Sequence, residues 1–72
     1  MTSDPALAIY DFIEKYKAAH AFSPAVFDIA IGCHLTTKVV RAQLDALVEA
    51  GYIRRRKASL VPVKRPLEAV EV

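Results

Sequence analysis

The stretch from Leu35 to Ile53, LTTKVVRAQLDALVEAGYI, decides the fold of this 72-residue chain. Its apolar residues recur at steps of three and four, which places them on one face of an α-helix: Val40, Leu44, Leu47 and Val48. Thr36 is suited to the N-cap because its hydroxyl can accept from an unpaired N–H of the first turn, and Gly51 is suited to the left-handed residue that ends a helix. One helix of about four turns is therefore expected here.

The charges along this helix run against its dipole. Lys38 and Arg41 lie in the first half, where the helix end is already positive, and Asp45 and Glu49 lie in the second half. This order is slightly unfavourable for folding alone. It suits a helix that presents its front, with bare N–H groups and two cations, to a polyanion. The competing interpretation is a solvated helix face with scattered charges.

Charge is also uneven along the whole chain, although the formal net charge is only +2. Residues 1–35 carry two lysines against four carboxylates, whereas residues 36–65 carry eight lysines and arginines against two carboxylates. An acidic first half and a basic second half indicate one face for an anionic partner. Solvated charge runs are common, so this pattern favours nucleic-acid binding without establishing it.

Length and composition indicate one small domain with a real core, since 54% of the residues are hydrophobic. The single cysteine has no partner for an internal disulfide, which suits a reducing compartment. No apolar run approaches the roughly 20 residues of a membrane span, and the first residues lack the pattern of a signal peptide. We expect a soluble, cytoplasmic and nucleoid-associated protein that contacts no membrane.

Two further helices are predicted before this stretch. Asp4 followed by Pro5 is a strong helix start, so the first helix should span about residues 5–19. Ser23 followed by Pro24 repeats this signal, so a second, shorter helix should begin there. The inward faces are expected at two sets of apolar residues: Ile9, Phe12, Ile13 and Tyr16 in the first helix, and Val26, Ile29, Ala30 and Cys33 in the second. Phe22 should fill the gap between the two helices or pair as a brief strand.

The end of the second helix has two candidates, Gly32 and His34, and we favour a left-handed His34 because the inward face extends to Cys33. Phe27 and Ile31 do not fit that face. Either they pack against the end of the first helix or the C-terminal tail, or they form a contact patch for another chain.

A basic β-hairpin is predicted after Gly51. Residues 52–56 have the pattern of a strand, residues 57–59 that of a turn, and residues 60–63 that of the returning strand, in which Pro62 is tolerable only at an edge. Strand alternation places Arg54 and Arg56 on the face opposite Ile53 and Arg55. Because Arg55 shares a face with an apolar residue, we expect it to have a structural role. We expect a lead at residues 1–4, a domain at residues 5–65 and a tail at residues 66–72, either frayed or a docking segment.

This order of elements resembles a winged helix-turn-helix domain, a three-helix fold that is mainly α with a small β-hairpin. The resemblance spans about residues 5–65. The spacing of its residues is similar to that in MarR-type regulators and in the N-terminal domain of LexA-type repressors. The residues that carry it are Asp28-Ile29-Ala30, Leu35-Thr36, Val40, Leu44, Leu47, Gly51 and Ile53, with Ile9-Tyr10-Asp11-Phe12-Ile13 also like the first helix of the latter. Gly32 and His34 depart from the family pattern around the turn.

The resemblance implies that the front of the third helix enters the major groove of double-stranded DNA and that the hairpin wing follows the backbone or the minor groove. The residues expected at DNA are Thr36, Thr37, Lys38, Arg41, Ala42, Arg54, Arg56 and Lys57. An arginine at the position of Arg41 can form a bidentate contact with guanine, worth about 1–3 kcal/mol of discrimination. The wing cations should set affinity rather than sequence preference, because phosphate contacts carry no base identity.

No constellation of catalytic residues stands out, so we expect no enzyme and no cofactor, metal or small-molecule ligand. The first interpretation is a small, sequence-specific transcriptional regulator, repressor-like, that forms a homodimer at least on DNA. A second is a protein-interaction module that uses four apolar residues: Phe27, Ile31, Leu67 and Val70. A third is a non-specific nucleic-acid-binding component of a replication or packaging complex.

Overall fold

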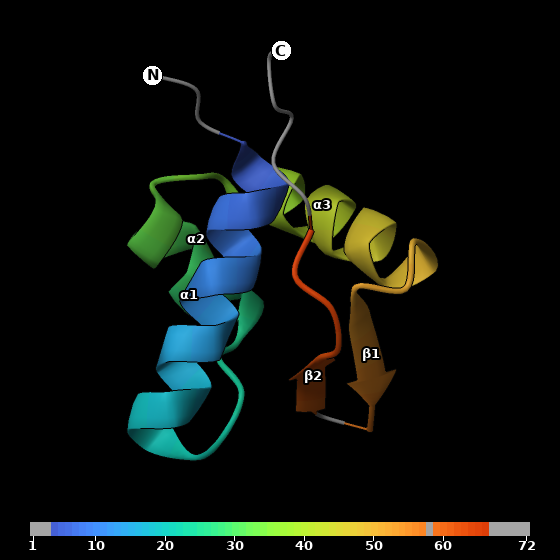
Figure 1. The fold of residues 1–72 in the computed structure, drawn as a ribbon. Coiled ribbons are helices and arrows are strands. Elements are labelled where there is room, and N and C mark those ends of the chain that lie inside the picture. The colour runs from blue at the N-terminus through green and yellow to red at the C-terminus, as the bar shows by residue number, and fades with distance from the viewer. Residues whose placement is uncertain (1–3, 58, 67–72) are drawn as a thin grey trace, which may run out of the picture.

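A computed structural model describes residues 4–57 and 59–66 of the chain. It contains three helices followed by a two-stranded antiparallel hairpin, with the bounds α1 Pro5–His20, α2 Val26–Cys33, α3 Thr37–Glu49, β1 Ile53–Arg56 and β2 Ser59–Pro62 (Figure 1). The predicted fold class, mainly α with a small β-hairpin, is confirmed. The order of elements is compatible with a winged-helix layout.

The first helix begins as the sequence predicts. The Asp4 carboxylate accepts from the N–H of Ala6 at 3.0 Å, and Pro5 occupies the first turn, where its missing N–H is not needed. The helix ends at His20, one residue beyond the predicted end, and Ala21 follows with a left-handed φ of 65°. The buried side of α1 carries Leu7, Ile9, Tyr10 and Ile13.

The second helix begins later than predicted, because Ser23 does not cap it. The N-cap is Ala25, whose N–H donates to the Asp28 carboxylate at 3.0 Å. The Ser23 hydroxyl instead accepts from the N–H of Leu60 at 2.8 Å, a residue distant in the sequence. At the other end the prediction is confirmed: His34 takes the left-handed conformation with φ 58° and ψ 44°.

Gly32 lies in α2 where the helix meets α1. A Cβ at this position would be 2.6 Å from Cζ of Phe12 and closer still to Cε2 of the same ring. The glycine at this position is therefore explained by the close approach of the Phe12 ring to the α2 backbone, and not by an unusual backbone angle.

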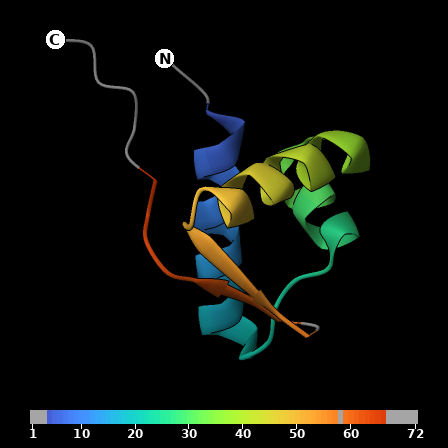
Figure 2. The same ribbon diagram turned by 90° about the vertical axis from the view of Figure 1, so that its right-hand side faces the viewer.

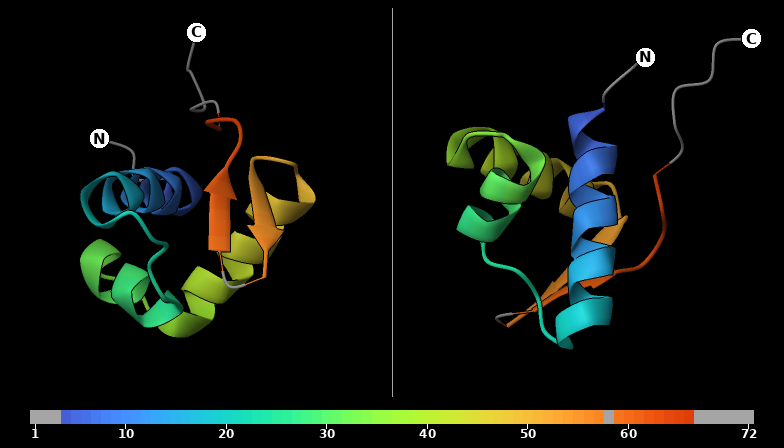
Figure 3. Two further views of the ribbon diagram at one scale, coloured as in Figure 1. Left: turned by 90° about the horizontal axis from the view of Figure 1, so that it is seen from below. Right: turned by 90° about the vertical axis from the view of Figure 1, so that its left-hand side faces the viewer.

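The core lies where the three helices meet, with α3 crossing behind α1 (Figure 1) and the hairpin closing one side (Figure 3). Its buried apolar residues come from all three helices and from β1: Ile9, Tyr10, Ile13, Ile29, Ala30, Val40, Leu44, Leu47 and Ile53. The inward faces predicted for α2 and α3 are thus confirmed at Ile29, Val40 and Leu44. Phe22, predicted to fill a gap, is instead 58% exposed and contacts the ring of Tyr16 edge-on.

The hairpin follows directly from α3 through Gly51, whose φ of 87° suits a glycine. In its register Ile53 pairs with Pro62 and Arg55 with Leu60. The outer edge of β2 is held at Leu60, whose carbonyl accepts from Lys17 Nζ at 3.0 Å and whose N–H donates to Ser23. Figure 2 shows the turn end of the hairpin beside the link between α1 and α2. The predicted turn residue Ala58 lies outside the described residues.

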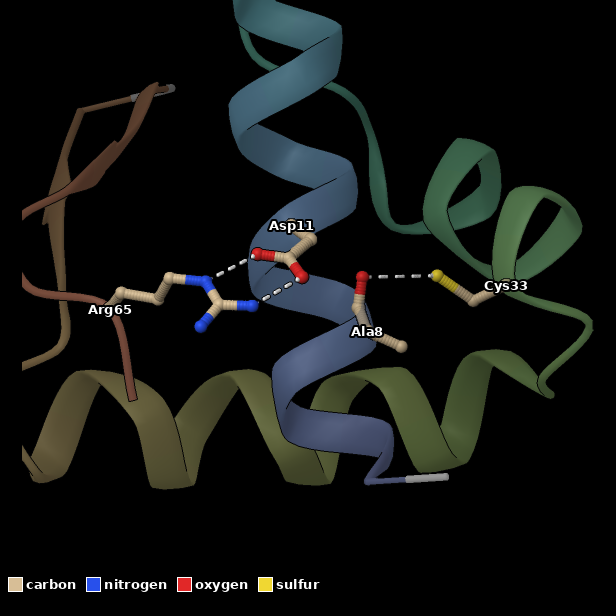
Figure 4. A network of polar contacts seen from close by, with 4 residues as sticks. All are labelled: Ala8, Asp11, Cys33 and Arg65. Atoms are coloured by element: carbon tan, nitrogen blue, oxygen red, sulfur yellow. Dashed lines mark hydrogen bonds and ion pairs between the residues drawn. The ribbon is translucent and has the colours of Figure 1, made fainter. Parts of the chain in front are cut away.

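The segment after the hairpin is held against α1. Arg65 donates through Nε and Nη2 to the two carboxylate oxygens of Asp11, both at 3.1 Å (Figure 4). On the opposite side of α1, Cys33 Sγ lies 3.8 Å from the carbonyl oxygen of Ala8. The two contacts join α1 to the segment after the hairpin and to the end of α2.

Candidate nucleic-acid interface

The front of α3 presents a polar, positively charged surface. Thr36 caps the helix by accepting from the N–H of Val39 at 3.2 Å. The buried side chains of Val40, Leu44 and Leu47 fix the rotation of the helix about its axis. The five α3 residues expected at DNA are consequently exposed: Thr36, Thr37, Lys38, Arg41 and Ala42. None of them is covered by the described part of the chain.

The four cations of the hairpin, Arg54, Arg55, Arg56 and Lys57, are exposed as well. Lys57 starts the turn with a left-handed φ of 49°. Arg55 behaves differently from its neighbours in β1, because its Nη2 lies 3.5 Å from Oδ1 of Asp45 on α3. The two side chains are 48% and 71% exposed, so the pair contributes only about 0–1 kcal/mol to stability.

An open hollow of about 420 Å³ lies between α3, the hairpin and the start of α2. Arg41 and Asp45 line it from α3, Arg55 and Lys57 line it from the hairpin, and the segment 24–26 closes its end. Figure 2 shows α3 and β1 diverging from their junction, with the front of the helix and the turn of the hairpin on the same side of the molecule but at different heights. Three cations from two elements therefore surround one space with a single carboxylate among its lining residues.

The structure brings together only part of the residue set predicted from the sequence. Arg41 and Lys57 line the same hollow, whereas Arg54 lines a second hollow of about 300 Å³, on the side of Val48 and Val63. Lys38 and Arg56 are exposed but line neither hollow. Arg55 lines both hollows, so it lies between the space at Arg41 and the space at Arg54.

Arg55 is the residue that sequence reasoning left out of the interface. The predicted alternation was right, since Ile53 is buried while Arg55 turns toward α3 and pairs with Asp45. The signal was available: Ile53 belongs to the core beside α3, and the residue two positions along a strand lies on the same side. Arg55 accordingly contacts α3 through Asp45 and, like Lys57, lines the hollow that Arg41 lines.

The predicted protein-contact residues divide into two pairs. Phe27 and Ile31 are 65% and 60% exposed, which excludes the interpretation that they pack against the end of α1. Leu67 and Val70 lie outside the described residues. Phe27 and Ile31 follow one another at helical spacing on α2, so an apolar patch remains open to solvent.

Two observations bear on other kinds of site. Among residues 4–57 and 59–66 no group of three or more His, Cys, Asp or Glu side chains could hold a metal ion. Burial raises the pKa of the Cys33 thiol, which disfavours its reactive thiolate form at neutral pH.

Compared with protein-family models and with curated proteins, the chain matches none. Of the helices in the described residues, none has the length and apolar character needed to cross a membrane.

Proposed function

We propose that this protein is a small double-stranded DNA-binding regulator of the winged helix-turn-helix type, with the front of α3 in the major groove and the hairpin as the wing. The observation that carries the proposal is the hollow at which Arg41, Arg55 and Lys57 meet beside the exposed front of α3. Phosphate neutralisation by lysine and arginine supplies most of the affinity of such proteins for DNA.

The division of labour follows from the position of each side chain. Arg41 and Lys38 lie on exposed turns of α3 and are the candidates for base contacts, with Thr36 and Thr37 beside them. The hairpin cations contact phosphates, and Arg54 and Arg56 extend the basic surface around the wing. If about five cations neutralise phosphates, the slope of log affinity against log salt is about −4.5.

A lone winged helix reads about half of a site, so we propose that a homodimer forms on DNA. Half-sites would then be one helical turn, about 34 Å, apart. Sedimentation of the protein with and without a palindromic duplex tests the dimer, and a monomer in both samples removes it.

The exposed Phe27 and Ile31 support a second candidate function, a protein-interaction module in which α2 supplies the contact.

A titration of labelled, mixed-sequence duplex at two salt concentrations, followed by fluorescence anisotropy, tests the proposal. A DNA-binding protein shows binding that weakens steeply with salt, whereas a protein-interaction module shows little affinity at either concentration. Selection of bound sequences from random DNA, followed by competition with unrelated duplex, then separates a sequence-specific regulator from a non-specific nucleic-acid-binding protein. Full displacement by equal amounts of unrelated duplex contradicts the regulator.

A further inference from the structure

Asp45 is the one carboxylate among the residues lining the hollow that holds Arg41, Arg55 and Lys57. It is 71% exposed and lies 3.5 Å from the guanidinium of Arg55, so it occupies the side of that cation nearest to α3. The opposing charge is placed on the second half of α3, where the helix dipole disfavours an anion. Asp45 also follows Arg41 by four residues, a spacing at which opposite charges on a helix attract.

The cations that line the hollow have the chemistry to bind a phosphodiester. Arg41 and Arg55 carry planar guanidinium groups that can bind phosphate oxygens in a fork, and Lys57 adds a point charge from the hairpin turn. They come from α3 and from the hairpin, so a single phosphate held among them would tie these two elements together. A backbone phosphate offers non-bridging oxygens that guanidinium and ammonium groups can share.

We propose that this hollow binds one backbone phosphate of the duplex and that Asp45 is an internal competitor, which the phosphate displaces from Arg55. The inference rests on the proposed DNA-binding function. Because the ion pair is largely exposed and screened by solvent, it yields readily to a phosphate. The carboxylate stays near the bound phosphate after displacement, so it lowers the affinity for DNA and makes binding more reversible.

The chain offers a matched control for this role. Asp45→Asn and Glu49→Gln each remove one negative charge from the exposed side of α3, one helical turn apart, but Glu49 does not line the hollow. Affinity is measured by fluorescence anisotropy with one labelled mixed-sequence duplex, since backbone phosphates are present in every sequence. Circular dichroism and thermal unfolding of each variant establish that the fold is retained.

We expect Asp45→Asn to bind up to about fivefold more tightly at low salt, because the phosphate no longer has to displace a carboxylate from an exposed ion pair with Arg55. We expect Glu49→Gln to change affinity less than about twofold, because screening weakens the charge over the added distance. The slope of log affinity against log salt should stay the same in Asp45→Asn, because the same phosphates are neutralised in both complexes. In an Arg55→Gln background, Asp45→Asn should lose most of its effect.

The outcomes separate this inference from the function on which it rests. Equal affinities of Asp45→Asn and Glu49→Gln, with clear binding by the unchanged protein, overturn the competitor role and leave the DNA-binding function standing. A gain in Asp45→Asn that persists undiminished in the Arg55→Gln background also overturns it, because the carboxylate would then act without Arg55. No binding by any variant at low salt removes both.

Discussion

Replacing Gly32 by alanine should destabilise the protein, although alanine is the better helix former. In an unhindered helix the substitution gains up to about 1 kcal/mol. Here the added Cβ would overlap the ring of Phe12, standing 2.6 Å from Cζ and closer to Cε2. The half-buried ring packs against the core, and its centroid is 5.9 Å from that of Tyr16, so turning it aside disturbs these contacts.

Overpacking of this kind costs about 1–3 kcal/mol, so after the gain in helix propensity the expected net loss in Gly32→Ala is about 0–2 kcal/mol. In a domain of this size that corresponds to a decrease in Tm of about 4–8 °C for each kcal/mol. Urea unfolding followed by far-UV circular dichroism measures the free energy of unfolding, and the slope against denaturant reports whether the native state has changed in compactness.

A double-mutant cycle with Phe12→Ala provides the control. When the ring is absent, Gly32→Ala should stabilise the protein by about 0.5–1 kcal/mol, because only the helix propensity remains. The sign of the effect should therefore reverse between the two backgrounds. The same change in stability in both backgrounds would refute the close contact between Phe12 and the α2 backbone.

Three smaller predictions concern other contacts. Ser23→Ala should lower the free energy of unfolding by about 1–2 kcal/mol and speed hydrogen exchange at the Leu60 amide, which loses its acceptor; unchanged exchange at that amide would contradict the anchor. Thr36→Ala should cost about 1 kcal/mol through loss of the α3 cap, while Thr37→Ala serves as the control, and equal losses would argue against capping. Burial, assisted by nearby carboxylates, raises the pKa of Tyr10 above its value in the unfolded chain. The stability that this shift contributes is fully present below about pH 10, and it is lost as the pH rises through the pKa of Tyr10 in the folded state. Absorbance titration should show one tyrosine, missing in Tyr10→Phe, that ionises later than the others.

Helix boundaries that depend on neighbouring residues are predictable from the sequence. Asp4 caps α1, Thr36 caps α3, and His34 ends α2 in the left-handed conformation, each as expected. The start predicted for α2 was wrong, because the hydroxyl of Ser23 does not cap the helix but accepts from the N–H of Leu60, which is distant in the sequence. A cap signal in the sequence gives no information about such a competing contact.

The candidate interface, too, is only partly predictable from the sequence. Exposure of Lys38 and Arg41 follows from the helical periodicity of α3, which the sequence states directly. The grouping of Arg41 with Arg55 and Lys57 does not follow from it, because it depends on the angle at which the hairpin leaves α3. Arg55 was assigned a structural role from strand alternation alone, and the structure adds that the same alternation directs it into the hollow.

The central claim is that the front of α3 and the hairpin turn bind one duplex together. Chemical-shift mapping of the isotope-labelled protein, titrated with a duplex at low salt, tests it residue by residue. The account predicts that the largest shifts fall at residues 36–42 and at Arg55 and Lys57, with little change at Phe27 and Ile31. Shifts confined to Phe27 and Ile31, or to α1, would contradict it.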